Sequence, residues 1–142
     1  MSLENPTNKM SKSDPNPNSR INLLDDPKTI TQKIARATTD SLRLIAFDPD
    51  RPGITNLLTI YQLLTRQSQQ EIEAEFAGKG YGDFKAALTE RLLATLEPIQ
   101  KHYYELMKDP ATLENILKQG AEQVRPMAAA TLQHVKDVIG LG

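Results

Sequence analysis

Apolar residues recur every three or four positions along most of this chain, a spacing that predicts amphipathic helices. The first run starts at Asp26-Pro27, an N-cap residue followed by the proline that a first helical turn tolerates. Its inner face, with Lys33 as the only polar member, comprises Ile30, Lys33, Ile34 and Ala37. A turn over residues 47–53 separates this run from a second helical run over residues 54–66.

Start and stop signals mark two further helices. Ser68 and Glu71 have the spacing of a capping box, which predicts a short helix through Phe76 that the glycines of residues 78–82 end. A long helix is then predicted from about Asp83 to Met107, with a kink at its internal proline, Pro98. Its predicted core stripe comprises Phe84, Leu88, Leu92, Thr95, Ile99 and Tyr103.

The C-terminal part repeats the same start signal at Asp109-Pro110. We expect that helix to close at Gly120 and a last helix to run from about Val124 to Gly140. No stretch shows the period-2 alternation of a strand. The sequence therefore predicts an all-α fold, a helical bundle of about five or six helices with an irregular N-terminal arm.

The arm covers residues 1–25, where prolines, asparagines and serines dominate, and the predicted helical domain covers residues 26–142. Composition adds a few exclusions. The chain has 142 residues, a formal net charge of -1 and no cysteine, so it carries neither a uniformly basic nucleic-acid coat nor a disulfide framework. The absence of cysteine fits a cytoplasmic location, and no apolar stretch approaches the ~20 residues of a membrane span.

Candidate chemistry lies in the arm, in the stretch "NKMSKSD" over residues 8–14. Lys9 and Lys12 stand three residues apart and can converge on one polyanion, while Ser11 and Ser13 add hydroxyl donors. Such a group can bind a triphosphate while negative charge develops on a leaving pyrophosphate. Lysines and serines in an asparagine-rich loop are more often only solvated, so composition alone favours that second interpretation.

The motif "KMSKS" at residues 9–13 resembles the second signature loop of class I aminoacyl-tRNA synthetases. The whole chain resembles the tryptophanyl-tRNA synthetases, as a C-terminal segment that begins just before that loop. The stretches that carry this resemblance are "MSLENPTNKMSKSDPNPNSRINLLDDPKTI" (1–30), "TDS" (39–41), "PGITNLLTIYQLL" (52–64), "GKGYGDFK" (78–85), "EPIQKHY" (97–103) and "GLG" (140–142).

The resemblance implies a parent enzyme that activates tryptophan with ATP to tryptophanyl-adenylate and transfers it to tRNA(Trp). Lys9 and Lys12 would be its catalytic cations at the ATP phosphates. Met10 would lie toward the adenosine, and Ser11 and Ser13 would complete the ATP-binding loop. Magnesium would accompany ATP, and no metal-ligating cluster is expected in this chain. The parent would be a cytoplasmic homodimer with no membrane partner.

The sequence lacks the strands and the first signature motif of a Rossmann catalytic domain. We therefore expect the isolated chain to be catalytically inactive and to hold no cofactor. The alternative is a freestanding helical tRNA-binding module without catalysis. On either hypothesis Tyr81 could stack on an unpaired base with Lys79 near a phosphate. A turn that needs its glycines for geometry explains "GKGYG" at least as well.

Overall fold

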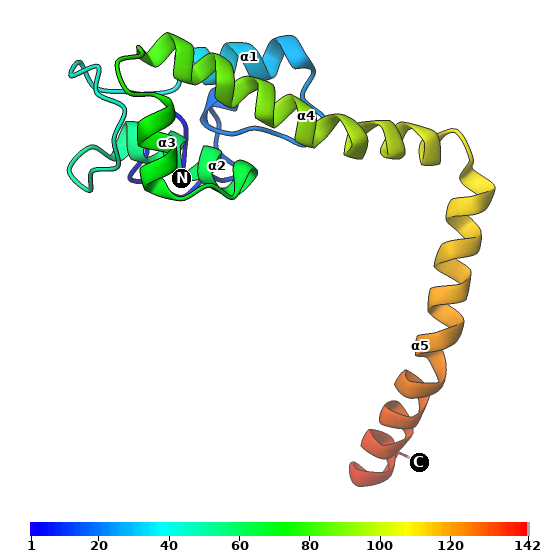
Figure 1. Cartoon of the computed structure of the whole chain (residues 1–142). Helices are drawn as coiled ribbons and strands as arrows, with labels where there is room; N and C mark the ends of the chain where they lie inside the picture. Colours follow the sequence, from blue (N-terminus) through cyan, green and yellow to red (C-terminus); the bar gives the residue numbers. More distant parts are fainter. Residues whose placement is uncertain (142) are drawn as a thin grey trace. The chain divides into compact units, whose positions relative to one another are not determined.

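The computed structural model describes residues 1–141 and shows five α-helices with one short 3₁₀ helix (Figure 1). These elements are η1 (Pro17–Ser19), α1 (Pro27–Arg36), α2 (Pro52–Thr65), α3 (Gln69–Glu75), α4 (Tyr81–Met107) and α5 (Pro110–Val138). No strand occurs among residues 1–141, so the all-α prediction is confirmed. The chain forms two compact units, residues 1–100 and the residues from Lys101 onward, which are described separately below.

Three aromatic rings lie at the centre of the first unit. Tyr61 of α2, Phe76 at the end of α3 and Phe84 of α4 meet edge to face, with ring centroids 5.1 to 5.7 Å apart. Such aromatic pairs add about 0.5–1.5 kcal/mol beyond the area they bury. Aliphatic side chains surround them and complete the core, namely Leu3, Ile30, Ile34, Ile45, Ile54, Leu57, Leu58, Ile72, Leu88, Leu92 and Leu96.

The buried row of α4 differs from the predicted one beyond Leu92. Leu96 is 7% exposed, whereas Ile99 is 47% exposed and Tyr103 39% exposed. Residues four apart lie along one line of a helix, and α4 buries the line through Phe84, Leu88, Leu92 and Leu96. The predicted stripe was therefore correct up to Leu92 and wrong for Thr95, Ile99 and Tyr103.

Helix α1 buries a lysine on its inner face. The Lys33 side chain is 5% exposed and pairs with Asp25, the residue that precedes the N-cap. Burial acts to raise the pKa of Asp25, but hydrogen bonds from Lys33 and Asn22 outweigh it and the pKa is lowered. The predicted start at Asp26-Pro27 is confirmed, because the Asp26 side chain accepts the Thr29 N–H.

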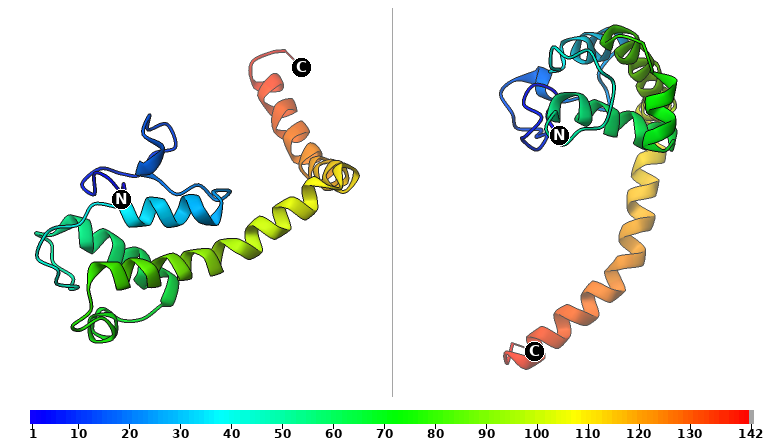
Figure 2. Two further views of the ribbon diagram at one scale, coloured as in Figure 1. Left: turned by 90° about the horizontal axis from the view of Figure 1, so that it is seen from above. Right: turned by 60° about the vertical axis from the view of Figure 1, so that its left-hand side comes forward.

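Helices α1 and α4 run side by side within the first unit (Figures 1 and 2). Lys85 of α4 joins them, because its ammonium donates to the carbonyls of Ala35 and Ala37 at 3.0 and 2.8 Å. Burial lowers the pKa of Lys85. The last carbonyls of a helix lack partners within it, and a cation that binds them stabilises the helix C-terminus. Lys85 of α4 therefore holds the C-terminal end of α1 in place.

The start of α2 lies very close to the chain that follows α1. A Cβ on Gly53 would stand 2.6 Å from the carbonyl oxygen of Thr38, so only glycine fits this position without a shift. Helix α3 then begins with the predicted capping box, in which Ser68 and Glu71 each bind the other's backbone N–H. The capping box was predicted and is confirmed, whereas the close approach at Gly53 was not predicted, and the predicted turn over residues 47–53 ends earlier, because α2 already begins at Pro52.

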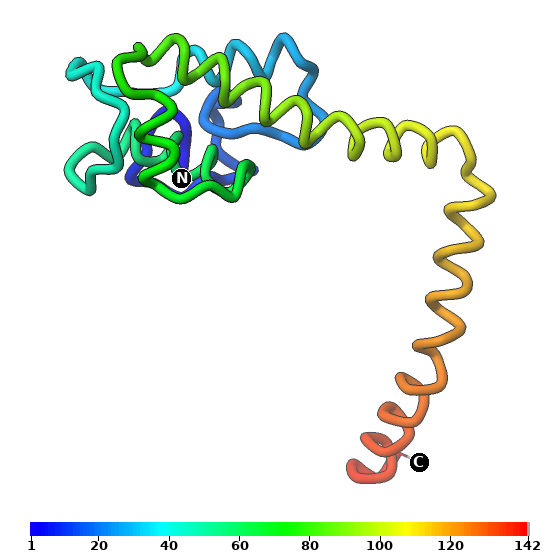
Figure 3. The backbone as a smooth tube through the Cα atoms, viewed as in Figure 1, coloured from blue at the N-terminus to red at the C-terminus, as the bar shows by residue number. Residues whose placement is uncertain are grey.

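The second unit consists of the end of α4 and the whole of α5. Helix α5 starts at Pro110, where the Asp109 side chain accepts the Thr112 N–H as predicted. The predicted stop at Gly120 was wrong, because the helix continues to Val138 and the backbone trace keeps its coil through that residue (Figure 3). Gly120 has an ordinary helical backbone, and an interior glycine weakens a helix by only about 1 kcal/mol relative to alanine.

No helix within the described residues has the length and apolar character needed to cross a membrane.

Candidate functional site

The N-terminal arm forms a loop that is closed at its base. The Leu3 N–H donates to the Ser19 carbonyl at 2.9 Å, and the Ser2 N–H donates to the Asn8 carbonyl at 2.9 Å. Leu3 is 1% exposed and Ser19 2% exposed, so both ends of the loop are buried in the first unit. Helix η1 forms the last turn of the loop and ends at Ser19, and the Asn16 side chain caps it by accepting the Asn18 N–H.

The signature residues 9–13 lie at the exposed side of this loop. Lys9, Lys12, Ser11 and Ser13 are exposed, and Met10 is half-buried against the core. The hydroxyls of Ser11 and Ser13 are hydrogen-bonded to each other at 3.0 Å, and the Ser13 N–H donates to the Ser11 hydroxyl. Within residues 1–141 the two ion pairs are Lys33–Asp25 and Arg51–Asp40, so both loop lysines keep their charges available.

Two residues outside the arm hold its base. The Thr38 N–H donates to the Leu3 carbonyl at 2.8 Å, and the Thr38 hydroxyl donates to the Glu4 carbonyl at 2.7 Å. From α2, the Asn56 side chain hydrogen-bonds the backbone of Met1 and Ser2. The left view of Figure 2 places the N-terminus beside the C-terminal end of α1, in agreement with the Thr38 contacts. Sequence reasoning missed both attachments.

A second polar cluster surrounds Asp40, which the sequence showed only as part of "TDS". Its carboxylate accepts Arg51 Nε at 2.9 Å and Nη2 at 3.2 Å, the Tyr81 hydroxyl at 2.6 Å and the Leu42 N–H at 2.8 Å. The Arg51 guanidinium also donates to the Leu44 carbonyl at 2.6 Å. Chiefly through the hydrogen bonds from Arg51, the pKa of Asp40 falls to about 2.

This cluster assigns Tyr81 a structural contact that the sequence did not reveal. Its hydroxyl accepts from Arg51 and donates to Asp40, while burial and the bond to Asp40 raise its pKa. The ring remains partly exposed. If Tyr81 contacts a base, it can do so only by stacking with its ring, because its hydroxyl is already hydrogen-bonded to Arg51 and Asp40.

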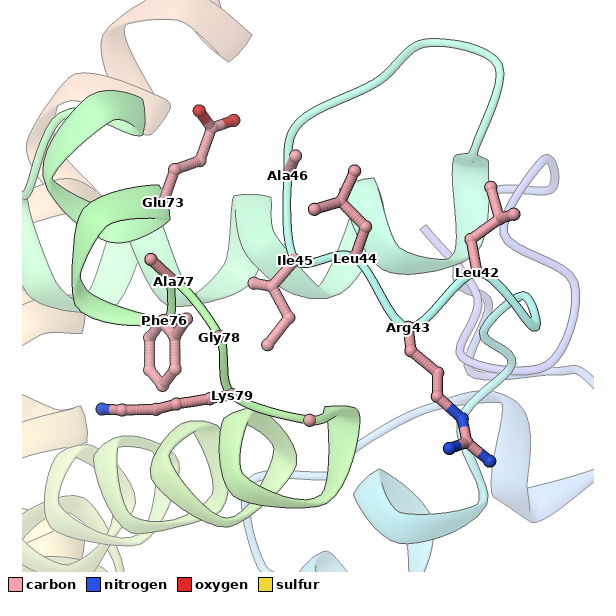
Figure 4. A pocket seen from close by; sticks show the side chains of 11 residues that line it. Leu42, Arg43, Leu44, Ile45, Ala46, Glu73, Phe76, Ala77, Gly78 and Lys79 are labelled. Carbon is pink, nitrogen blue, oxygen red and sulfur yellow. The ribbon is translucent and has the colours of Figure 1, made fainter.

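Lys79 lies beside an open groove of about 610 Å³ between residues 42–46 and 76–80 (Figure 4). Its side chain runs under the Phe76 ring, with Nζ 5.0 Å from the ring centroid, a cation–π contact. Arg43 has a positive φ of 57° and points away from Lys79 on the other side of the groove. The lining of the groove ends at Gly80, the residue before Tyr81, and no hydrogen bond or ion pair among residues 1–141 joins Lys79 or Tyr81 to residues 9–13.

Known proteins resemble this chain over both the signature loop and the helices. The family model of the tRNA synthetases class I (W and Y) matches residues 1–97. The tryptophan--tRNA ligase of Thermosynechococcus vestitus is 52% identical over 141 residues, which cover 99% of this chain and 43% of that protein. The chain thus spans less than half the length of this curated relative, and it corresponds to the C-terminal part of such relatives.

Solved structures give the same result. The crystal structure of tryptophanyl-tRNA synthetase from Mycoplasma pneumoniae matches with a TM-score of 0.85 and 37% identity, covering all of this chain and 43% of that one. Tryptophanyl-tRNA synthetase from Campylobacter jejuni complexed with ADP and tryptophan matches with a TM-score of 0.74 and 29% identity, covering 99% of this chain and 44% of that one.

This chain belongs to the class I tRNA synthetases of the tryptophan and tyrosine group. Within that group, the predicted resemblance to tryptophanyl-tRNA synthetases is confirmed, because the curated relatives and solved structures described above carry that name.

Proposed function

We propose that this chain is the C-terminal part of a tryptophan--tRNA ligase, which activates tryptophan with ATP and transfers the tryptophanyl group to tRNA(Trp). The observation that carries the proposal is the 52% identity to a tryptophan--tRNA ligase over 99% of the chain, including the signature loop. The freestanding-module alternative gains no support, since the relatives described above are all more than twice as long as the matched segment.

The loop supplies positive charge where the reaction develops negative charge. Lys9 and Lys12 are proposed as the catalytic cations that bind the ATP phosphates and stabilise the departing pyrophosphate. Their exposure and the absence of an ion pair to them within residues 1–141 support this role, because a paired lysine would first have to leave its partner. Ser11 and Ser13, linked to each other, keep the loop turn compact and offer further hydrogen bonds to phosphate.

Met10 is proposed to lie toward the adenosine, with its half-buried side chain joining the loop to the core. ATP is the substrate of the proposed reaction, and the ADP complex of the Campylobacter jejuni protein supports binding of an adenine nucleotide in such proteins. Among residues 1–141 no group of three His, Cys, Asp or Glu side chains could hold a metal ion. Magnesium is therefore proposed only as the companion of the ATP phosphates.

The helical residues 26–142 are proposed as the anticodon-side domain, and residues 1–25 as the arm that carries the ATP loop. Lys79 and Tyr81 are the proposed contacts to tRNA, supported by the position of Lys79 at the groove and by the partial exposure of Tyr81. The full-length protein is proposed to be a cytoplasmic homodimer. The activity requires a catalytic domain beyond this segment, so the isolated chain is proposed to be inactive.

The test is pyrophosphate exchange by the full-length ligase that carries this segment, with Lys12→Ala as the variant. Removing one preorganised charged donor from such a site lowers the rate on the order of 100- to 1,000-fold. Lys28→Ala, an exposed lysine of α1, is the matched control and should leave the rate unchanged. An exchange rate within a factor of a few of the unmodified enzyme for Lys12→Ala would reject the assignment.

A further inference from the structure

Asn56 is a buried polar residue of α2. It is 8% exposed and lies on the side of the helix away from the buried row of Ile54, Leu57, Leu58 and Tyr61, where it contacts the start of the arm. Its Oδ1 accepts the main-chain nitrogen of Met1 at 2.9 Å, and its Nδ2 donates to the carbonyls of Met1 and Ser2 at 3.2 and 3.1 Å. All three partners are backbone groups at the start of the arm.

A short series of hydrogen bonds leads from this residue to the signature loop. Asn56 holds the Ser2 carbonyl, and the Ser2 N–H donates to the carbonyl of Asn8, the residue before Lys9. The Ser2 hydroxyl also accepts the N–H groups of Glu4 and Asn5 at 3.3 and 3.2 Å. Ser2 is 3% exposed, so this connection is shielded from water along its inner part.

The hydrogen bonds of Asn56 fix the position of the arm's backbone relative to α2, which packing alone does not do. A buried polar side chain weakens the fold unless its hydrogen bonds are made, and here the carbonyl and amide groups of the Asn56 side chain both have partners. A leucine would fill the space without that requirement. The amide of Asn56 fixes the backbone of residues 1–2 at one position along α2, whereas an apolar contact has no such directional requirement.

We propose that Asn56 is a positioning residue for the loop over residues 9–13: through Ser2 and Asn8 it sets where Lys9 and Lys12 stand, without touching substrate. The catalytic part of this proposal rests on the proposed function, in which these lysines bind ATP phosphates. The positional part concerns this chain alone and is measured without any activity.

The positional test uses spin labels, because the chain has no cysteine of its own. Nitroxides attached at Lys12→Cys and Leu63→Cys, both exposed positions, report the distance from the loop to α2 by pulsed electron paramagnetic resonance. With Asn56 present we expect one narrow distance distribution. Asn56→Ala and Asn56→Leu should both broaden it, although leucine keeps most of the side-chain volume.

Two controls separate loop position from general destabilisation. Thr59→Ala removes a hydroxyl that donates to the Thr55 carbonyl of the same helix, and it should leave the distribution unchanged. Ile72→Val weakens the core at a buried position of α3 and should lower Tm. Ile72 takes no part in the hydrogen bonds of Asn56, so this variant should also leave the distance distribution narrow. A distribution of the same width with Asn56 and with Asn56→Leu overturns the proposal.

The catalytic test is a double-mutant cycle for pyrophosphate exchange in the full-length ligase. Displacing reacting groups by about 1 Å can lower a rate ~100-fold, so Asn56→Leu is expected to lower kcat on the order of 10- to 100-fold with the KM for tryptophan unchanged. If Asn56 acts through Lys12, adding Asn56→Leu to Lys12→Ala causes little further loss. Fully additive losses overturn this role. If Lys12→Ala itself loses nothing, the proposed function fails, and the spin-label result still decides the positional claim.

Discussion

From the hydrogen bonds around Asp40 we predict how the free energy of unfolding depends on this carboxylate and on pH. Arg51, whose side chain is 7% exposed, has Asp40 as its only carboxylate partner among residues 1–141, and the Asp40 side chain is 28% exposed. Asp40→Asn keeps the shape of the side chain but removes its charge. The guanidinium of Arg51 is then desolvated opposite a neutral amide, and the Tyr81 hydroxyl loses its charged acceptor.

The magnitude follows from the pKa of Asp40, which is about 2 in the folded chain against an ordinary value of 3.8. At 1.36 kcal/mol per pH unit this difference corresponds to about 2 kcal/mol, which solvent screening of a partly exposed carboxylate reduces to about 1–2 kcal/mol. The folded pKa is lowered, so this stabilisation is complete above the unfolded pKa. It is lost as the pH falls from about 4 to about 2.

The assay is urea unfolding followed by far-UV circular dichroism at about pH 7 and about pH 2.5. We expect Asp40→Asn to lower the free energy of unfolding by about 1–2 kcal/mol at the higher pH, and by clearly less at the lower pH. Asp50→Asn, an exposed aspartate in the same loop, makes the same charge change and should stay within about 0.5 kcal/mol. An equal loss at both pH values, or a carboxyl titration of Asp40 by NMR near 3.8, would refute the reasoning.

Alanine substitutions at two glycines should have opposite effects on stability. Gly53→Ala places a Cβ 2.6 Å from the Thr38 carbonyl oxygen, a backbone atom that cannot rotate away, so we expect the free energy of unfolding in urea to fall by about 1–3 kcal/mol. An unchanged unfolding midpoint would contradict the close approach. Gly120→Ala adds a Cβ inside α5 that meets no described atom within 4 Å beyond the neighbouring backbone of its own helix. Helix content by circular dichroism should therefore rise, and the helix should gain about 1 kcal/mol. A loss of helix content would instead support the stop that the sequence suggested at Gly120.

The helix starts could be predicted because their signals are local. Asp26, Ser68 and Asp109 each use a side-chain oxygen to accept the N–H three residues further on. Such caps depend on a few neighbouring residues and not on the rest of the fold. Gly120 is the informative failure. A glycine after an apolar run is typical of a C-cap, but the αL backbone of a glycine cap is absent there.

The sequence predicted which loop carries chemistry but not what holds it. "KMSKS" is contiguous, so residues 9–13 could be identified from the motif alone, and their roles stay predictions. Asn56 and Met1 are 55 positions apart, and Tyr81 and Asp40 are 41 apart. No periodicity relates residues at such separations. No local signal marked Asn56, because α2 also contains Thr55, Thr59 and Gln62 and nothing in the sequence separates the buried amide from these polar side chains.

The arm shows how a segment without regular structure can still present defined charges. Leu3 and Ser19 are buried and joined, so the loop between them begins and ends at fixed points of the first unit. Lys9 and Lys12 extend from this loop with side chains that make no ion pair among residues 1–141. Electrostatic stabilisation of a transition state requires donors that are already close to their positions, and a flexible lysine stem can still follow a moving phosphate. A fixed backbone base combined with free side-chain ends meets both requirements. The helices matter to the proposed chemistry for this reason, since α2 and the end of α1 hold the base from which the lysines reach.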